Sequence, residues 1–348
     1  MPALTKTIPR KVNVAVVGLG FMGRTHLRVY LENPQAQVVA VCGLNRVPVN
    51  GVLAGIEGNV KKTDDIVLRP GVKVFRSFER LLAEPDIDLV DLCTPTALHP
   101  AQAIAALKAG KHVLCEKPLA LTSRAAVEVL KSAESAPGFL MPAMCMRFWP
   151  GWSWLKRIVA EKIYGEILAA RFCRFSEMPA WTQANTFSDA SASGGALFDF
   201  HIHDTDFIHY LFGRPAGVFS TGVIDKASRI DHVTTQYHYP HGPAVHAEAS
   251  WLRAQGFNMA YTLHCEKATV DFDMARGVAA LTVLERGHSP QTIQLELSDG
   301  YTEEIRYFVD CIGKNSPPET VTVRDALTAL EICEAEEKSI RNNCYIKI

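Results

Sequence analysis

The sequence predicts two domains. Residues 1–146 are expected to form an α/β domain with a doubly wound parallel sheet, and residues 147–348 a domain with a mainly antiparallel sheet. Two observations support this. Apolar strand-like runs alternate with helical patterns in the first part, which is typical of a parallel sheet. Between residues 217 and 299, strand-like runs follow one another without a helix, which favours antiparallel pairing.

The strands of the first domain are expected where apolar residues run without interruption, because a central parallel strand is buried on both faces. These runs lie at 12–18, 37–43, 72–75, 87–95, 112–118 and 139–146. Helical patterns lie at 21–33, 99–110 and 122–135, the second ending at Gly110 and the third capped by Thr122 or Ser123. The segment 46–71 holds two prolines and four glycines, and we expect a loop or a short distorted helix there.

The second domain is expected to open with a helix at 152–165 and a half-buried strand at 166–177. Further strands are expected at 217–224, 232–239, 244–252, 259–273, 278–285 and 292–298. Two helices at 302–313 and 322–342 and a short strand at 344–348 end the chain. We expect the last helix to pack back on the first domain.

The composition narrows the class of protein. With 36 basic and 37 acidic residues, nothing indicates a nucleic-acid or membrane partner. No apolar run approaches the roughly 20 residues of a membrane span, and the first 18 residues lack the pattern of a signal peptide. The nine cysteines are scattered without a C-x-x-C pair, so we expect them to be reduced, as in a cytoplasmic enzyme.

A glycine-rich turn directly follows the first strand. Residues 18–23 read Gly-Leu-Gly-Phe-Met-Gly, which matches G-x-G-x-x-G between a strand and a helix. Gly18 would make the tight turn, Gly20 would let the backbone approach a pyrophosphate, and Gly23 would let helix and strand pack closely. The turn, with Phe21 and Met22 at the helix N-terminus, therefore predicts a dinucleotide site. The alternative is that the glycines serve only as turn residues.

The segment after the second strand bears on the choice of nucleotide. A carboxylate there would bind the ribose 2′-hydroxyl of NAD, but the sequence has Asn45 and Arg46 instead. A guanidinium suits a 2′-phosphate, so the sequence favours NADP, with NAD as the alternative. Arg46 as an ordinary solvated loop charge is the competing interpretation.

The stretch 94–120, "TPTALHPAQAIAALKAGKHVLCEKPLA", closely resembles the glucose–fructose oxidoreductase / inositol dehydrogenase (Gfo/Idh/MocA) family. The likeness extends over nearly the whole chain, including "RFWPGW", "GGALFDFHIHDTDF" and the terminal helix. It implies a Rossmann domain followed by an α+β domain with an open, mainly antiparallel sheet. It also implies an oxidoreductase that moves a hydride between a nicotinamide nucleotide and a carbon of a sugar, polyol or related compound.

The resemblance also implies roles for individual residues. Thr94, Pro95, His99, Glu116 and Lys117 would line the cofactor site. Lys117 of Glu-Lys-Pro and the D-x-x-x-H pair Asp199 and His203 would be catalytic.

From the residues themselves, Lys117 ends a strand at the edge where doubly wound sheets bind ligands, and burial there would lower its pKa. An ammonium at that edge would bind the reacting oxygen. Histidine titrates near neutrality, so His203 suits a general acid/base, with Asp199 assisting. An ordinary surface lysine is the alternative for Lys117.

The segment 199–206 also raises the possibility of a metal site, because it reads "DFHIHDTD" and is rich in histidine and aspartate. Residues 196–212 have a helical pattern that ends at Gly213, and on a helix Asp199 and His203 share a face while His201 points away from His203. On a strand, His201 and His203 would share a face and could bind one ion. On a helix they point in different directions and cannot. We therefore expect no metal, with His201 packed in the core or hydrogen-bonded. Asp204, Asp206 and His209 are expected to be structural or exposed.

The remaining expectations concern substrate and partners. Arg147 is expected either to touch the substrate or to form an ion pair between the domains. Trp181 lies in an irregular segment where its ring would stack on a sugar or serve packing. The open sheet predicts a homodimer or homotetramer. The rival functions are a nucleotide-binding sensor or scaffold without turnover, and a metal-dependent hydrolase or lyase that uses the "HIHD" segment.

Overall fold

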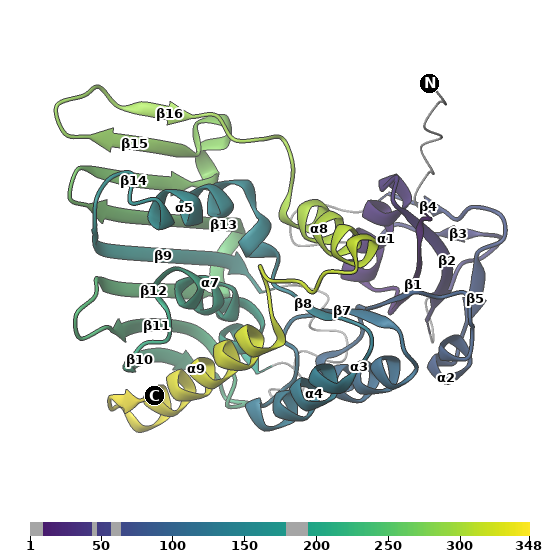
Figure 1. Cartoon of the computed structure of the whole chain (residues 1–348). Helices are drawn as coiled ribbons and strands as arrows, with labels where there is room; N and C mark the ends of the chain where they lie inside the picture. The colour runs from purple at the N-terminus through teal and green to yellow at the C-terminus, as the bar shows by residue number, and fades with distance from the viewer. Residues whose placement is uncertain (1–9, 44–46, 57–63, 179–193) are drawn as a thin grey trace, which may run out of the picture.

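The fold-class prediction is confirmed. The computed structural model describes residues 10–43, 47–56, 64–178 and 194–348, and it contains a six-stranded parallel sheet and a nine-stranded mixed sheet (Figure 1). The parallel sheet has the order β5-β2-β1-β6-β7-β8. Its strands are β1 (Val12–Val17), β2 (Ala36–Cys42), β5 (Lys73–Phe75), β6 (Leu89–Leu92), β7 (His112–Glu116) and β8 (Leu140–Ala143). The helices between them are α1 (Phe21–Glu32), α2 (Phe78–Leu82), α3 (His99–Lys108) and α4 (Ser123–Ser135).

The larger sheet has the order β16-β15-β14-β13-β9-β12-β11-β10-β17. These strands are β9 (Ile167–Glu177), β10 (Gly217–Ile224), β11 (Ile230–His238), β12 (Ala244–Ser250), β13 (Leu252–Cys265), β14 (Ala268–Asp273), β15 (Leu281–Glu285), β16 (Gln291–Ile293) and β17 (Ile346–Lys347). All neighbours are antiparallel except β9 and β12, which pair in parallel. Helix α7 (Ile202–Phe212) lies between β9 and β10 in the chain, and β12, the third strand of the antiparallel series β10–β11–β12, runs beside β9 in the same direction.

Three local expectations were incomplete. The segment 46–71 does not form a helix in its described part, where β3 (Val52–Leu53) and β4 (Ile66–Val67) pair as a small antiparallel hairpin. The expected strand 259–273 is two strands, because the chain turns at residues 266–267 between β13 and β14. The short helix α2 was not expected, and it begins where the hydroxyl of Ser77 accepts the N–H of Arg80.

The C-terminal helices join the two sheets. Helix α5 (Pro150–Ala160) and helix α7 (Ile202–Phe212) cover one face of the larger sheet, along which α9 (Val323–Asn342) also runs (Figure 1). Near its middle α9 also contacts α4, where Glu334 accepts hydrogen bonds of 2.7 Å from the backbone N–H and the hydroxyl of Ser123. Among the described residues, no helix is long and apolar enough to cross a membrane.

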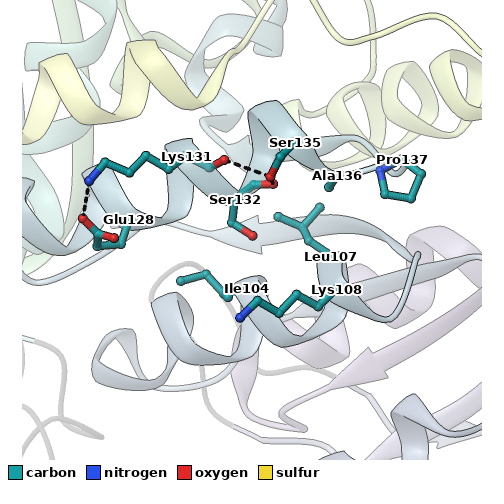
Figure 2. Close-up of a pocket in the computed structure, with 9 residues that line it drawn as sticks. All are labelled: Ile104, Leu107, Lys108, Glu128, Lys131, Ser132, Ser135, Ala136 and Pro137. Atoms are coloured by element: carbon teal, nitrogen blue, oxygen red, sulfur yellow. Dashed lines mark hydrogen bonds and ion pairs between the residues drawn. The ribbon is translucent and has the colours of Figure 1, made fainter.

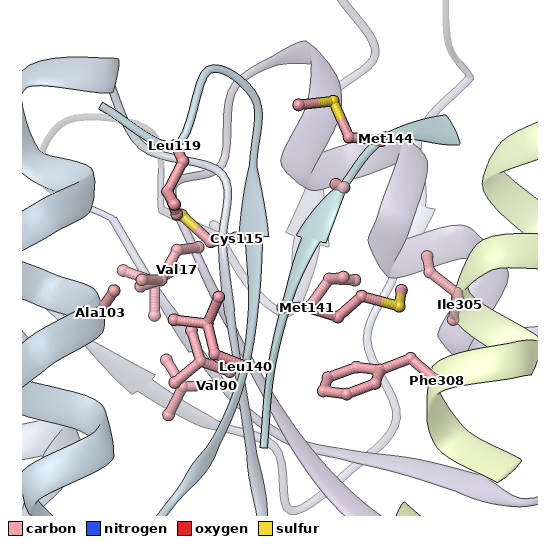
Figure 3. Close-up of a cluster of buried hydrophobic side chains, with 14 of the residues drawn as sticks. Val17, Val90, Ala103, Cys115, Leu119, Leu140, Met141, Met144, Ile305 and Phe308 are labelled. Atoms are coloured by element: carbon pink, nitrogen blue, oxygen red, sulfur yellow. The ribbon is translucent and has the colours of Figure 1, made fainter. Parts of the chain in front are cut away.

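Helix α8 (Gly300–Lys314) packs on the parallel sheet of the first domain, although in the sequence it follows the strands of the second sheet up to β16. Figure 3 shows Ile305 and Phe308 of α8 beside Met141 of β8, on the opposite face of the sheet from Ala103 of α3. These side chains belong to one buried cluster, so the parallel sheet is covered on this face by a helix from the second half of the chain. This packing brings α8 next to the residues described below.

Candidate active site

The glycine loop lies where the strand order of the parallel sheet reverses. The chain moves outward from β1 to β2 and β5 and then returns to β6 on the other side of β1, and such switch points are where these sheets bind ligands. Gly18 has a φ of +90°, and a Cβ on it would lie 2.3 Å from the carbonyl oxygen of Cys93. The loops after β1 and β6 therefore touch at this edge, and only glycine fits at residue 18.

The other two glycines have different surroundings. A Cβ on Gly23 would lie 1.7 Å from the carbonyl oxygen of Gly18, so the first turn of α1 packs against the loop itself. Gly20, the N-cap of α1, has open space around the position of a Cβ, and the first turn of the helix has no acidic residue. A helix N-terminus with open space beside it and no negative charge is what a pyrophosphate requires.

The two glycines should therefore respond differently to alanine. We expect Gly23→Ala to lower the free energy of unfolding of the nucleotide-free protein by about 1–3 kcal/mol, since backbone must move to admit the methyl group. Gly20→Ala should change the free energy of unfolding by about 1 kcal/mol or less. It should instead weaken nucleotide affinity about tenfold or more, equivalent to about 1.4 kcal/mol. Chemical denaturation and nucleotide titration of both variants measure this, and equal stability losses would contradict it.

Thr94, Pro95 and His99 lie in the loop after β6 and at the start of α3. The imidazole of His99 is buried between two backbone carbonyls, with Nδ1 2.7 Å from the oxygen of Pro118 and Nε2 2.7 Å from that of Thr94. A neutral ring can donate to one of these carbonyls and an imidazolium to both. Burial lowers the pKa of His99, and the two carbonyls oppose that effect. His99 thus ties the loop after β6 to the loop after β7.

Lys117 directly follows β7 and contacts the second half of the chain. Its Nζ donates to the backbone oxygen of Asp199 at 2.6 Å and to the Oδ1 of the same residue at 2.9 Å. Burial by itself would lower the pKa of Lys117, as we expected from the sequence. The carboxylates of Asp199 and Glu116 outweigh burial and raise the pKa, so that expectation was wrong. Lys117 is a cation held in place, with its side chain 15% exposed.

The helix that carries Asp199 begins with a π turn. Residues Leu197–His201 are π-helical and continue as α7, which ends at Gly213 with a φ of +79°. The expected helix 196–212 is therefore present, but its first turn is wider than an α-helical turn. In this turn the backbone oxygen of Asp199, as well as its carboxylate, accepts a hydrogen bond from Lys117. Periodicity does not distinguish a π turn from an α turn.

His203 lies one residue into α7. Burial lowers its pKa well below the ordinary value, and the positive charges of Lys117 and Arg174 lower it further. The ring is therefore neutral near pH 7 and able to accept a proton. Its buried Nδ1 makes no hydrogen bond with any residue that the structure describes.

The other polar residues of this segment are engaged elsewhere. His201 has no exposed surface, and its Nε2 lies 3.1 Å from the hydroxyl of Tyr237 and 3.3 Å from Glu336 of α9. Asp204 accepts two hydrogen bonds of 2.9 Å from Arg174 of β9. The side chains of His201 and His203 thus have different surroundings, as expected for a helix.

Arg147 forms an ion pair, but within the second domain rather than between the domains, which was one of the two expectations from the sequence. Its guanidinium donates to both carboxylate oxygens of Asp206, at 2.9 and 2.6 Å, and to the backbone oxygen of Thr320 at 2.8 Å. The side chains of Arg147 and Asp206 are each 1% exposed. Three other predicted site residues, Asn45, Arg46 and Trp181, lie outside the described residues.

Removing the guanidinium should therefore cost stability. We expect Arg147→Met to lower the free energy of unfolding by about 3–5 kcal/mol, because Asp206 would be left buried without its partner. The matched control is Arg324→Met, which removes an exposed ion pair with Glu134 and should cost about 1 kcal/mol or less. Denaturant unfolding measures both. A stable Arg147→Met protein with weak substrate binding would show instead that Arg147 binds substrate.

The pocket drawn in Figure 2 lies away from this site. It is lined by the C-terminal halves of α3 and α4, with Leu107, Ser135 and Pro137 among its residues (Figure 2). Because α3 and α4 lead into β7 and β8, these helix ends lie near the amino ends of the strands. The glycine loop and Lys117 lie at the carboxyl ends, so the pocket takes no part in the candidate site.

Sequence reasoning missed the surroundings of Glu116. Its Oε2 accepts the backbone N–H of Lys117 at 2.9 Å, and its Oε1 lies 3.3 Å from Nε2 of His26 in α1. Glu304 of α8 faces the same Nε2 of His26, at 3.9 Å. One signal was available: Glu304 falls on the same helical face as the apolar Phe308, four residues later. An acidic residue on an apolar face indicates a buried carboxyl group.

Comparison with protein families matches both halves of the chain. Residues 12–144 match the model described as "Oxidoreductase family, NAD-binding Rossmann fold" of GFO_IDH_MocA, and residues 152–271 match the GFO/IDH/MocA C-terminal domain. A levoglucosan dehydrogenase of Pseudarthrobacter phenanthrenivorans is 32% identical over 60% of this chain and 53% of that protein. A myo-inositol 2-dehydrogenase of Thermotoga maritima is 25% identical over 97% of this chain and 98% of that protein.

The first curated relatives are matched over little more than half of their length, between 53% and 58%. Among solved structures, a levoglucosan dehydrogenase in complex with NADH and L-sorbose has a TM-score of 0.82 at 20% identity. That similarity covers 97% of this chain and 99% of the other, and at this identity it shows the fold alone.

Proposed function

The chain belongs to the Gfo/Idh/MocA family of oxidoreductases, and from this premise we propose that it transfers a hydride between NAD(P) and a hydroxyl or carbonyl carbon of a sugar, polyol or related compound. The observation that carries the proposal is the contact of Lys117 with Asp199 beside the neutral ring of His203. A cation and a neutral base at the carboxyl edge of the parallel sheet are what alcohol oxidation requires.

Each residue then has a chemical task. Within the described residues, Lys117 gives two of its three ammonium N–H bonds to Asp199, which leaves the third for the reacting oxygen. There the cation stabilises negative charge as the hydroxyl proton departs. His203 accepts that proton and returns it in the reverse direction, while Asp199 orients Lys117.

The nucleotide, when bound, would supply the hydride acceptor or donor. The glycine loop and the N-terminus of α1 fit a pyrophosphate, because Gly20 borders open space and the first turn has no acidic residue. We assign the cofactor site to Gly18, Gly20, Phe21, Met22 and Gly23, together with Thr94, Pro95, His99, Glu116 and Lys117. NADP is the preferred nucleotide and NAD the alternative, on the basis of Asn45 and Arg46 in the sequence.

Thermal unfolding tests the nucleotide assignment. The purified, nucleotide-stripped protein is heated with NADP⁺, with NAD⁺ and with neither, since a ligand that binds only the folded state raises the midpoint. A rise with NADP⁺ alone supports Arg46 as the 2′-phosphate ligand, and a rise with NAD⁺ alone reverses the preference. No rise with either nucleotide would overturn the proposal.

Turnover tests the reaction. Reduction of the nucleotide is followed with a panel of polyols and sugars that includes levoglucosan and myo-inositol, the compounds named for two relatives. We expect nucleotide-dependent oxidation of at least one cyclic polyol. Binding of nucleotide without turnover of any member of the panel would favour the sensor interpretation.

We further propose a homodimer or homotetramer that pairs through the uncovered face of the larger sheet. Along β10, Val218 and Ser220 are buried beneath α9, whereas the alternating residues Phe219 and Val223 are 40% and 47% exposed. A sheet face that carries exposed apolar residues is a common interface. Light scattering is expected to give a mass of two or four chains, and Phe219→Glu should lower it. A monomer would contradict this assignment.

The cytoplasm is the proposed location. None of the nine cysteines takes part in a disulfide, which fits a reducing compartment.

A further inference from the structure

A cluster of ionisable side chains is buried beneath the glycine loop, and four elements contribute to it. His26 comes from α1, Asp91 from β6, Glu116 from the end of β7 and Glu304 from α8. The Nδ1 of His26 lies 2.9 Å from Asp91, and its Nε2 lies 3.3 Å from Glu116 and 3.9 Å from Glu304. The side chains of His26, Asp91 and Glu304 have no exposed surface, and that of Glu116 is 8% exposed.

Three carboxyl groups thus surround one imidazole, and they differ in their hydrogen bonds. Asp91 pairs with His26, and Glu116 accepts the backbone N–H of Lys117. Neither oxygen of Glu304 has a hydrogen-bond partner among the described residues. A buried carboxylate without such partners is costly, whereas the protonated acid is not charged.

The pKa values of Glu304 and Glu116 differ in the same sense as their hydrogen bonding. Burial raises the pKa of Glu304 well above its ordinary value; the charge of His26 opposes this, and the carboxylates Glu116, Asp91 and Asp299 add to it. For Glu116, burial acts in the same direction, but His26 and Lys117 outweigh it and lower the pKa. The proton therefore stays on Glu304 and the negative charge on Glu116. The other titratable groups nearby are Cys93, whose Sγ lies 3.5 Å from Nδ1 of His26 and 3.3 Å from Asp91, together with Tyr30 of α1, Cys145 and Tyr301.

The position of Glu304 depends on close packing of α8. At the first residue of that helix, Gly300, a Cβ would lie 2.6 Å from the backbone oxygen of Cys145. Ile305 lies beside the buried sheet in Figure 3. Since the helix cannot shift easily, the carboxyl group of Glu304 occupies a defined place against His26.

We propose that Glu304 is a positioning residue of the reaction: placed 3.9 Å from the Nε2 of His26 that Glu116 also faces, and without a hydrogen-bond partner of its own among the described residues, it leaves His26 to Glu116, keeps Glu116 aimed at the backbone of Lys117 and so sets the place of the Lys117 ammonium. The inference rests on the proposed function. A second ionised carboxylate at this point would repel Glu116 and compete for His26. An apolar replacement would remove the carboxyl group that packs beside this pair at Nε2 of His26.

Stability against pH tests the protonation without any assay of activity. The folded state holds the proton of Glu304 above the pH at which the unfolded chain releases it, so this group makes stability fall as pH rises from about 4.3 upward. Glu304→Gln cannot ionise. Its unfolding midpoint should therefore rise relative to that of the wild type between pH 5 and about 9. The control is Glu303→Gln, which removes an exposed pair with Arg306. A difference between Glu304→Gln and wild type that stays constant over this range would overturn the proposal.

Kinetics test the positioning. Glu304→Gln should keep kcat within about threefold of the wild type, since the amide reproduces the shape of the neutral acid, whereas Glu304→Ala should lower kcat about tenfold, equivalent to about 1.4 kcal/mol, with KM within about threefold. Equal kcat in all three proteins would overturn the proposal. If the wild type turns over no polyol while the pH-dependent stability difference is present, the proposed function fails and the neutral state of Glu304 stands.

Discussion

Replacing Lys117 by methionine is expected to lower kcat about 10²–10³-fold, equivalent to about 2.7–4 kcal/mol of transition-state stabilisation. The methionine side chain keeps much of the length of lysine but carries no charge and no N–H donor. The reacting oxygen would then lose its cation, and Asp199 would lose the partner 2.9 Å away. Steady-state kinetics with the polyol found in the substrate panel measure the loss.

Two controls separate this effect from general damage. Lys131→Met changes a lysine on α4 whose side chain is 65% exposed, and it should leave kcat unaffected. Lys117→Arg keeps the charge but replaces a compact ammonium with a planar, wider group, so we expect it not to restore activity. A Lys117→Met protein with more than about a third of the wild-type kcat would remove Lys117 from the mechanism.

Replacing His203 by glutamine is expected to lower kcat/KM about 10²–10⁴-fold, the usual contribution of a general acid/base. The wild-type pH profile carries a second signature. Because the pKa of His203 is lowered, the ring stays neutral as pH falls through the ordinary histidine value of about 6.5. Alcohol oxidation should therefore persist below pH 6.5 and decline only at more acidic pH. The His203→Gln protein should lack this acid limb.

His201→Gln is the matched control, two residues earlier on the same helix. His201 contacts Tyr237 and Glu336 rather than Lys117, so its loss should lower the unfolding midpoint and leave kcat within about threefold. Equal kinetic losses at residues 201 and 203 would contradict the assignment of His203. Preserved activity in the His203→Gln protein would do so directly.

Much of the candidate site was accessible from local patterns. The glycine loop, the strand-end position of Lys117 and the helix ending at Gly213 each depend on a few neighbouring residues. The backbone conformation at a glycine and the periodicity of a helix are local properties, and for this reason these features could be predicted from the sequence alone. The family resemblance added the roles of Asp199 and His203, which no spacing in this chain specifies.

The errors concern contacts between distant residues and backbone geometry that the sequence pattern does not distinguish. Burial of Lys117 was expected to lower its pKa, but Asp199, 82 residues later, supplies the charge that raises it. The π turn at Leu197–His201 has the same apolar pattern as an α-helical turn. The parallel pairing of β9 with β12 depends on which strands become neighbours in the folded sheet. The alternation of apolar and polar residues within a single strand does not reveal its neighbours.

The sequence by itself determined most of the order of strands and helices, the glycine turn and the residue types that can do the chemistry, because these depend on chain-local sterics and hydrophobic periodicity. Only the tertiary structure decided which charges meet. It assigned Arg147 to Asp206, Asp204 to Arg174 and Glu304 to His26. Electrostatic interactions act through space over a few ångströms, so the protonation of Lys117, His203 and Glu304 depends on neighbours that only folding brings together.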